Sequence, residues 1–90
     1  MMDFAAVLNG LHTGRRYART GWNGKGMFIF LVNGSTFNVN REPLKSILGE
    51  GTEVQYNPHI DMRTADGSIG VWTASQADLL ATDWEEVKGG

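Results

Sequence analysis

Three glycines, a tryptophan and two cations occur within eight residues near the start of the chain. The segment reads Arg19-Thr20-Gly21-Trp22-Asn23-Gly24-Lys25-Gly26. Backbone N–H groups of such a turn can approach a phosphate closely, with Arg19 and Lys25 as counter-charges. The segment is not a Walker A loop, because its glycine spacing differs and no Ser or Thr follows the lysine. It is consistent either with an anion-binding loop or with a structural turn that Trp22 anchors in the core.

A second tryptophan, Trp72, follows a predicted β-hairpin. Asp66-Gly67 is typical of a two-residue type I′ turn, because both central positions of that turn need positive φ. This turn would place Asp61 opposite Trp72. The residues then directed to the core are Ile60, Met62, Thr64, Ile69 and Val71. The opposite face would carry His59, Asp61, Arg63, Gly70 and Trp72. A planar ligand could stack on the Trp72 ring there, unless the following helix or a second subunit covers it.

A helix start is predicted shortly after Trp72. Ser75-Gln76-Ala77-Asp78 has the [ST]-x-x-[DE] pattern of a capping box. The N–H groups and the hydroxyl at such a start can bind an anion, although Ser75 can equally serve only as a cap.

Residues suited to catalysis or metal binding are scarce. The chain has no cysteine, and its two histidines, His12 and His59, have no partner at metal-ligand spacing. No serine stands in the G-x-S-x-G pattern of a nucleophile elbow. His59 and Asp61 could form an acid–base pair, but an ordinary polar strand face is the better explanation. The sequence therefore predicts no catalytic site, metal ion or cofactor.

The elements that must position these residues follow from the spacing of apolar side chains. Asp3 is a suitable N-cap for an amphipathic helix that runs to about Thr13 and ends at Gly14. Strands outside the Asp66-Gly67 hairpin are predicted at residues 17–19, 27–32 and 84–87. The second of these is apolar on both faces, which indicates a central or interfacial strand.

The middle of the chain is less regular. Asn33-Gly34 predicts a second hairpin, with Phe37 and Val39 on the returning strand. Pro43 as a first helical residue and Gly49 as a stop predict one short helix. A last short helix is expected to start at Ser75 and to run through Leu80.

Composition bounds the class of protein. The 90 residues are 41% hydrophobic and 20% charged, as in a single globular domain near the lower size limit for a self-sufficient core. Small size without disulfides favours a homo-oligomer. Residues 1–45 hold six Lys/Arg and two Asp/Glu, hence +4, whereas residues 46–90 hold two and eight, hence −6. This asymmetry suits a phosphate-collecting pole, complementary subunit surfaces or plain solvated charge. The acidic balance argues against duplex DNA as a partner, and no apolar run is long enough for a membrane span.

Five segments, taken in order, match the motifs of one known family. They are residues 4–8 (FAAVL), 18–27 (ARTGWNGKGM), 58–67 (PHIDMRTADG), 72–81 (WTASQADLLA) and 83–85 (DWE). Together they resemble the small phage and prophage family known as Thoeris anti-defense 2, and the match is collinear over nearly the whole chain. Two features depart from the family pattern. Relatives often have a proline where this chain has Val71, and residues 41–56 align with no family motif.

The resemblance implies a sponge protein, which binds a cyclic nucleotide immune signal such as glycocyclic ADP-ribose and holds it without cleaving it. It also implies homotetramers with ligand pockets at subunit boundaries. Some relatives bind cyclic oligonucleotides, the signals of CBASS defence, at separate pockets.

The resemblance and the motifs together give one set of candidate ligand-binding residues. They are Arg19, Trp22, Asn23, Lys25, Asp61, Trp72, Ser75 and Gln76. The two tryptophans would stack on the base, the uncharged polar residues would hydrogen-bond ribose or phosphate, and the two cations would balance phosphate charge.

We therefore expect an α+β fold in one domain over residues 1–90. It would be a small antiparallel sheet with an N-terminal helix and one or two short helices, assembled as a homo-oligomer, a tetramer by resemblance. Its function would be to sequester a cyclic nucleotide in the cytoplasm of an infected bacterial host. The alternatives are a protein-binding inhibitor or a small virion component, and, less in keeping with the residues, an enzyme that degrades the signal.

Overall fold

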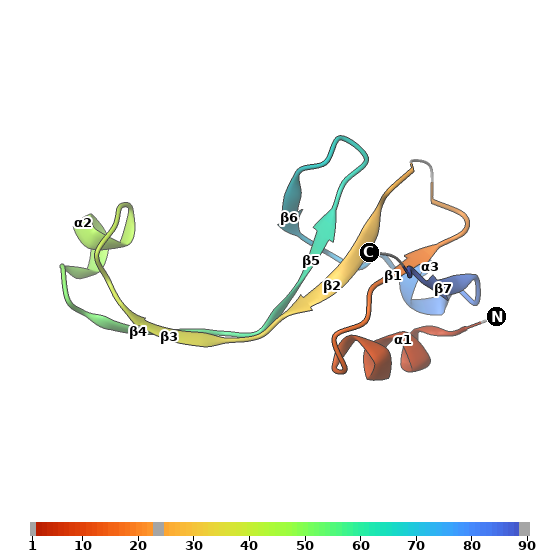
Figure 1. The fold of residues 1–90 in the computed structure, drawn as a ribbon, viewed down its shortest axis with the longest axis horizontal. Coiled ribbons are helices and arrows are strands. Elements are labelled where there is room, and N and C mark those ends of the chain that lie inside the picture. The colour runs from red at the N-terminus through yellow and green to blue at the C-terminus, as the bar shows by residue number, and fades with distance from the viewer. Residues whose placement is uncertain (1, 23–24, 89–90) are drawn as a thin grey trace.

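The computed structural model describes residues 2–22 and 25–88. The helices of this part of the chain are α1 (Phe4–Leu11), α2 (Leu44–Leu48) and α3 (Gln76–Leu80). Its strands are β1 (Tyr17–Arg19), β2 (Phe28–Val32), β3 (Ser35–Asn38), β4 (Glu53–Tyr56), β5 (His59–Arg63), β6 (Ile69–Val71) and β7 (Trp84–Glu86). The expected small α+β fold is confirmed, and Figure 1 shows its elements.

Five strands form one antiparallel sheet in the order β6-β5-β2-β1-β7. β2 is the middle strand, as its apolar residues on both faces predict. Ile29 of β2 points to one face and is fully buried there, whereas its neighbours Phe28 and Phe30 point to the other face and are half-buried. The two faces of the sheet therefore have different surroundings.

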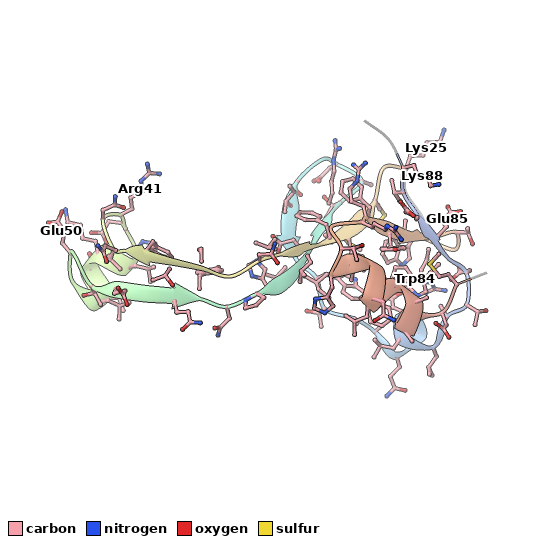
Figure 2. All side chains as sticks on the ribbon, turned by 60° about the horizontal axis from the view of Figure 1, so that its bottom comes forward. Lys25, Arg41, Glu50, Trp84, Glu85 and Lys88 are labelled. Carbon is pink, nitrogen blue, oxygen red and sulfur yellow. The ribbon has the colours of Figure 1, made fainter. Side chains whose placement is uncertain are left out.

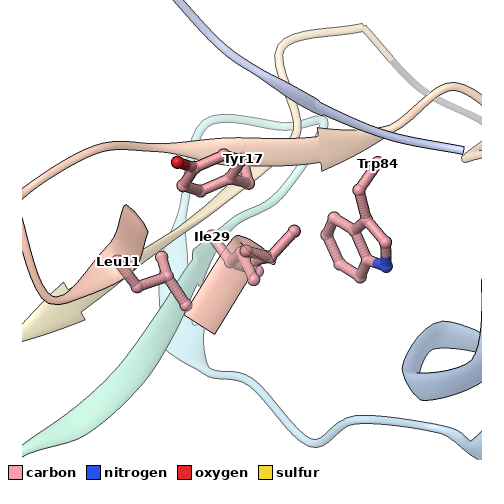
Figure 3. Packing of buried hydrophobic residues seen from close by; sticks show 5 residues of the cluster. Leu11, Tyr17, Ile29 and Trp84 are labelled. Atoms are coloured by element: carbon pink, nitrogen blue, oxygen red, sulfur yellow. The ribbon is translucent and has the colours of Figure 1, made fainter. Parts of the chain in front are cut away.

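The core lies between this sheet and α1 (Figure 3). Asp3 caps α1, because its carboxylate accepts a hydrogen bond from Ala6 N at 3.0 Å. The buried side chains of the core are Val7, Leu11, Tyr17, Ile29 and Trp84. Gly10 lets the Tyr17 ring lie against the helix, since a Cβ at residue 10 would stand 1.6 Å from the Tyr17 hydroxyl.

β3 and β4 form a separate two-stranded ribbon with α2 at its tip, and this arm, residues 35–56, projects from the body of the molecule (Figure 1). The molecule measures 47 × 29 × 27 Å as a result. Arg41 and Glu50 lie at the tip, far from Trp84 in the body (Figure 2). The predicted short helix is present, although Pro43 takes the N-cap position rather than the first helical one, and Gly49 ends it with φ of 94°.

The hairpin predicted at Asn33-Gly34 is wrong. The chain runs on from β2 into β3, and β2 pairs with β5 while β3 pairs with β4. Gly34 serves close approach rather than a turn, since a Cβ there would lie 2.7 Å from the Tyr56 carbonyl oxygen of the neighbouring strand. β4 was not predicted.

The register predicted for the Asp66-Gly67 hairpin is also wrong, by one residue. Asp61 lies opposite Val71 rather than Trp72. The loop has three residues instead of two, because Thr64 N donates to Ser68 O at 2.9 Å and Gly67 alone takes positive φ, 89°.

The shifted register exchanges the faces of β6. Ile69 and Val71, predicted to be buried, share a face with Asp61 and Arg63 and are 60% and 72% exposed. Trp72 N donates to Ile60 O at 3.0 Å, so Trp72 lies beside the core face rather than on the polar one.

No helix within residues 2–22 and 25–88 is long and apolar enough to cross a membrane.

Candidate functional site

Four aromatic rings form a cluster on the face of the sheet that carries α1. Trp84 lies at its centre and is 2% exposed, so this ring packs in the core. Its ring centroid is 5.2 Å from that of Trp22 and 6.1 Å from that of Trp72, both edge-on. Phe4 lies 5.5 Å from Trp84 and 5.8 Å from Trp72. Trp22 and Trp72 are half-buried, so each is held by the cluster while part of its ring stays at the surface.

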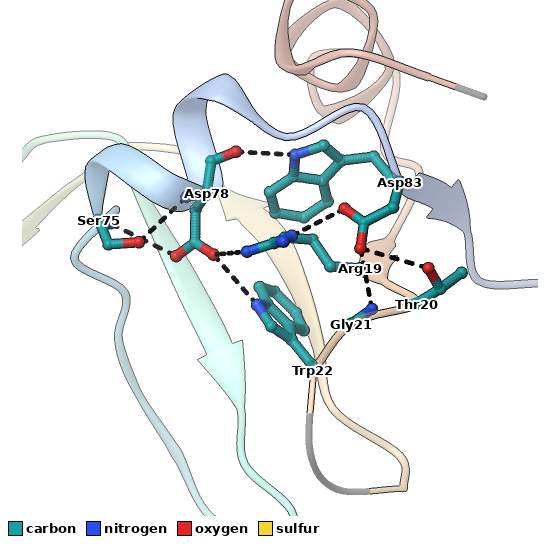
Figure 4. Close-up of polar contacts among 8 residues, drawn as sticks. Arg19, Thr20, Gly21, Trp22, Ser75, Asp78 and Asp83 are labelled. Carbon is teal, nitrogen blue, oxygen red and sulfur yellow. Dashed lines mark hydrogen bonds and ion pairs between the residues drawn. The ribbon is translucent and has the colours of Figure 1, made fainter.

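Two aspartates fasten the Trp22 loop to the body (Figure 4). Asp78 Oδ1 accepts hydrogen bonds from Arg19 Nη1 at 2.9 Å and from Trp22 Nε1 at 3.2 Å. Asp83 accepts from Arg19 Nε at 2.8 Å and from Gly21 N at 2.9 Å. A Cβ at Gly21 would lie 2.9 Å from the Asp83 carboxylate, so a larger residue there would displace this carboxylate.

Asp78 also organises the start of α3. Ser75 Oγ accepts from Asp78 N at 3.0 Å, and Asp78 Oδ2 accepts from Ser75 N at 3.4 Å, which confirms the predicted capping box. Trp84 Nε1 donates to the Asp78 carbonyl oxygen at 2.9 Å. The start of α3 already holds a carboxylate, so a further anion there would lie close to a negative charge.

The charges of this network are fixed by their partners. The hydrogen bond to Asp83, and then that to Asp78, raises the pKa of Arg19 above its ordinary value. Burial raises the pKa of Asp78, but the hydrogen bonds from Arg19 and Trp22 outweigh burial, and the pKa lies below its ordinary value. The hydrogen bond from Arg19 lowers the pKa of Asp83. One cation and two carboxylates give the network a net charge of −1.

Trp72 lines two surface hollows. The larger, of about 500 Å³, is lined by Phe4, Leu8, His12, Leu31, Pro58, His59, Ile60, Trp72, Ala74 and Leu79. The smaller, of about 350 Å³, is lined by Met62, Thr64, Gly70, Val71, Trp72 and Thr73. Both volumes lie in the range of small-molecule sites, and the first is mainly apolar with two histidines at its wall.

The structure brings half of the predicted ligand-binding residues together. Arg19, Trp22 and Ser75 all contact Asp78, and Trp72 joins them through the ring of Trp84. The two remaining residues of this part of the fold, Gln76 and Lys25, are exposed.

Lys25 lies at the end of the body opposite the arm (Figure 2). Asn23 lies outside the described residues. Asp61 is on the other face of the sheet, where its carboxylate lies 3.4 Å from His59 Nε2.

Sequence reasoning missed the partners that hold the site. The sequence placed Asp78 only in a capping box and predicted no contact for Asp83, because their bonds to Arg19 span 59 and 64 residues. His12 and His59 line one hollow although 47 positions separate them. The helical spacing of Phe4 and Leu8 indicated a buried face, but not that part of that face borders a cavity. Among the described residues, no group of three or more His, Asp or Glu side chains is arranged to hold a metal ion.

Comparison with known proteins shows the family to which this chain belongs. The model of the Thoeris anti-defense 2-like domain matches residues 2–87. The protein named Thoeris anti-defense 2 from Bacillus phage SP01 is 37% identical over 91 residues, which cover 96% of this chain and 94% of that protein. The family name indicates an anti-defence protein of phages. On both the family match and this relative, the chain belongs to the Thoeris anti-defense 2-like family.

Proposed function

We propose that this protein is a sponge that sequesters a cyclic nucleotide immune signal, of the glycocyclic ADP-ribose type, without cleaving it. The observation that carries the proposal is the Trp72 ring, which Phe4 and Trp84 hold in place while it lines two hollows large enough for a base or a ribose. Stacking of a base on an aromatic ring contributes about 1–3 kcal/mol, and a fixed ring loses little freedom on binding.

Trp22 is the second stacking residue in this proposal. Its Nε1 is tied to Asp78, which sets the plane of the indole before any ligand arrives. Ser75, Gln76 and Asn23 would hydrogen-bond the ribose, whose hydroxyl groups carry no charge to be repelled by Asp78. The fixed Trp22 ring favours tight binding, because the cost of ordering that side chain is met on folding.

The phosphate charge needs cations beyond Arg19. That guanidinium uses two of its five N–H donors on carboxylates, and the network that contains it is negative overall. Lys25 is the exposed cation of the same loop. We therefore propose that the pocket is completed at a subunit boundary of a homo-oligomer, a tetramer, where a second copy adds positive charge.

The binding test is calorimetric titration with glycocyclic ADP-ribose. Trp72→Ala should weaken binding more than tenfold, and Trp72→Phe should restore most of it because a smaller ring still stacks. Trp84→Ala should instead lower the melting temperature, because that ring is buried in the core. Parent-like binding by Trp72→Ala, with a near-ultraviolet circular dichroism spectrum that shows a folded protein, would remove Trp72 from the site.

The fate of the ligand separates a sponge from an enzyme. The complex is heated, the protein is removed, and the supernatant is analysed by chromatography. We expect the nucleotide to be recovered intact in stoichiometric amount, since the candidate site holds no activated nucleophile. Recovery of a hydrolysed product would move the protein to the class of degrading enzymes.

The arm supports the second candidate function, a protein-binding inhibitor. Its exposed apolar side chains are Phe37, Ile47, Leu48 and Tyr56. A projecting ribbon with such side chains suits contact with another protein. A protein that binds no cyclic nucleotide in the titration, yet forms a stoichiometric complex with a purified defence protein, would favour this function.

A further inference from the structure

One face of the five-stranded sheet is covered by none of the helices within residues 2–22 and 25–88. α1 and α3 contact one another and pack on the face that carries Ile29 and Trp84, and α2 lies at the tip of the arm (Figure 1). The opposite face, here called the open face, is formed by alternate residues of β2, β5 and β6. Its side chains are Phe28, Phe30, Val32, His59, Asp61, Arg63, Ile69 and Val71.

The open face consists of three parallel rows. The middle row, on β5, holds Arg63, Asp61 and His59 at alternate positions, and His59 Nε2 lies 3.4 Å from the Asp61 carboxylate. On either side of Arg63 lie Phe28 and Ile69, its Cα partners. Asp61 is flanked in the same way by its own Cα partners, Phe30 and Val71. Opposite charges in the middle are thus flanked by an aromatic row on β2 and an aliphatic row on β6.

We propose that the open face is the contact between two copies of this chain, stacked with their β5 strands antiparallel. The two-fold axis lies in the plane of the interface, runs perpendicular to β5 and passes over Met62. It maps residue 61 onto residue 63 of the other copy. It therefore stacks Arg63 on the partner's Asp61, and Asp61 on the partner's Arg63. The same axis keeps β2 over β2 and β6 over β6, so aromatic side chains meet aromatic ones and aliphatic side chains meet aliphatic ones.

The charges select this orientation. A two-fold axis parallel to β5 would place Asp61 over its own copy and Arg63 over its own copy, which repel at close range. The open face is also hollowed. Phe28, Arg63 and Arg16 line a hollow of about 450 Å³, and the Arg16 guanidinium lies 5.1 Å from the Phe28 ring centroid. In the proposed dimer, a side chain of the partner fills this hollow.

This inference rests on the proposal that the protein is a homo-oligomer, and charge reversal tests the surface itself. Arg63→Glu and Asp61→Lys should each reduce the mass measured by light scattering to half or less of the parent value at about 10 µM. Each change leaves a buried charge facing a like charge. The double variant with both changes should regain the parent mass, because the pairs are restored with reversed polarity. Lys88→Glu changes the charge equally at an exposed position away from the open face and should keep the parent mass.

A second pair of variants guards against loss of folding. Ile69→Lys and Val71→Lys alter side chains that the isolated subunit leaves mostly in solvent, so each should reduce the mass while the near-ultraviolet spectrum stays unchanged. If the four single variants keep the mass of an oligomeric parent, or if the double variant stays dissociated, the assigned surface is wrong and the oligomer stands. A monomeric parent would contradict both the assigned surface and the proposed homo-oligomer.

Discussion

Asp78 is the residue on which most of the candidate site depends. Its carboxylate bonds to Arg19 and Trp22, its backbone carbonyl oxygen accepts from Trp84, and its side chain caps α3. A single residue thus joins the loop that carries one tryptophan to the helix that follows the other. The consequence for function is that a change at this residue alters ring position without contact with a ligand.

Acid should lower the stability of the fold, because it protonates Asp78. The pKa of Asp78 is lower in the folded chain than its ordinary 3.8, so its contribution to stability is complete above that pH and is lost as the pH falls through the lower, folded value. Asp78→Asn should lower the melting temperature at pH 7 by several degrees, since 1 kcal/mol corresponds to about 4–8 °C in a domain of this size. It should also reduce the further loss between pH 4 and pH 2.

Thermal melts of parent and variant over that range make the measurement. Asp66, whose pKa the hydrogen bonds from Thr64 and Ser68 lower to about 2, keeps part of the acid response in the variant. Asp3→Asn is the matched control, because asparagine caps α1 as well as aspartate does. Identical acid limbs in parent and Asp78→Asn would show that the network adds nothing to stability.

At the scale of elements, the contact between α1 and β1 depends on Gly10, which has no side chain. Gly10→Ala would place a Cβ 1.6 Å from the Tyr17 hydroxyl, and the Tyr17 ring is too buried to move away freely. We expect a loss of about 1–3 kcal/mol in the free energy of unfolding, as for other overpacked cores. Gly70→Ala is the control, since a Cβ there meets nothing within 4 Å. Denaturant titration compares the two, and equal midpoints would contradict the prediction.

Elements with strong local signals were predictable, and their pairing was less so. The cap at Asp3, the capping box at Ser75 and the apolar run of β2 each depend on a few neighbouring residues, and all three are confirmed. Asn33-Gly34 has the sequence of a turn, yet the strands on either side find partners in β4 and β5, and that competition between distant segments has no local signal. The single extra residue in the Asp66-Gly67 loop was sufficient to exchange the faces of β6.

For the candidate site, the sequence showed which side chains are suited to binding but not which of them contact one another. The tryptophans beside glycines and the capping serine can be recognised from residue type and spacing alone. That Arg19 would bond to two aspartates about sixty positions away depends on β1 lying beside β7 in the sheet. Long-range contacts of this kind follow from topology, which the sequence alone left open.

At the scale of the whole molecule, the body and the arm are separable. The described contacts of β3 are with β4, and all three tryptophans lie in the body. Ser35 and Tyr56 are Cα partners, so Asn-Gly can replace residues 36–55 and close a short hairpin. The shortened protein should keep the near-ultraviolet spectrum of its tryptophans. A collapsed spectrum would mean that the arm is needed to fold the body.

This separation has an evolutionary consequence. β2 and β5 are neighbours in the sheet, and the arm is only the continuation of their hairpin. Because side chains alternate along a strand, the arm can gain or lose residues in pairs on both strands without changing which face any body residue occupies. Selection can therefore vary the reach of the arm and the surface at its tip while the tryptophan cluster stays constant, so that the outline of the molecule can change by lengthening a hairpin and without remodelling the core.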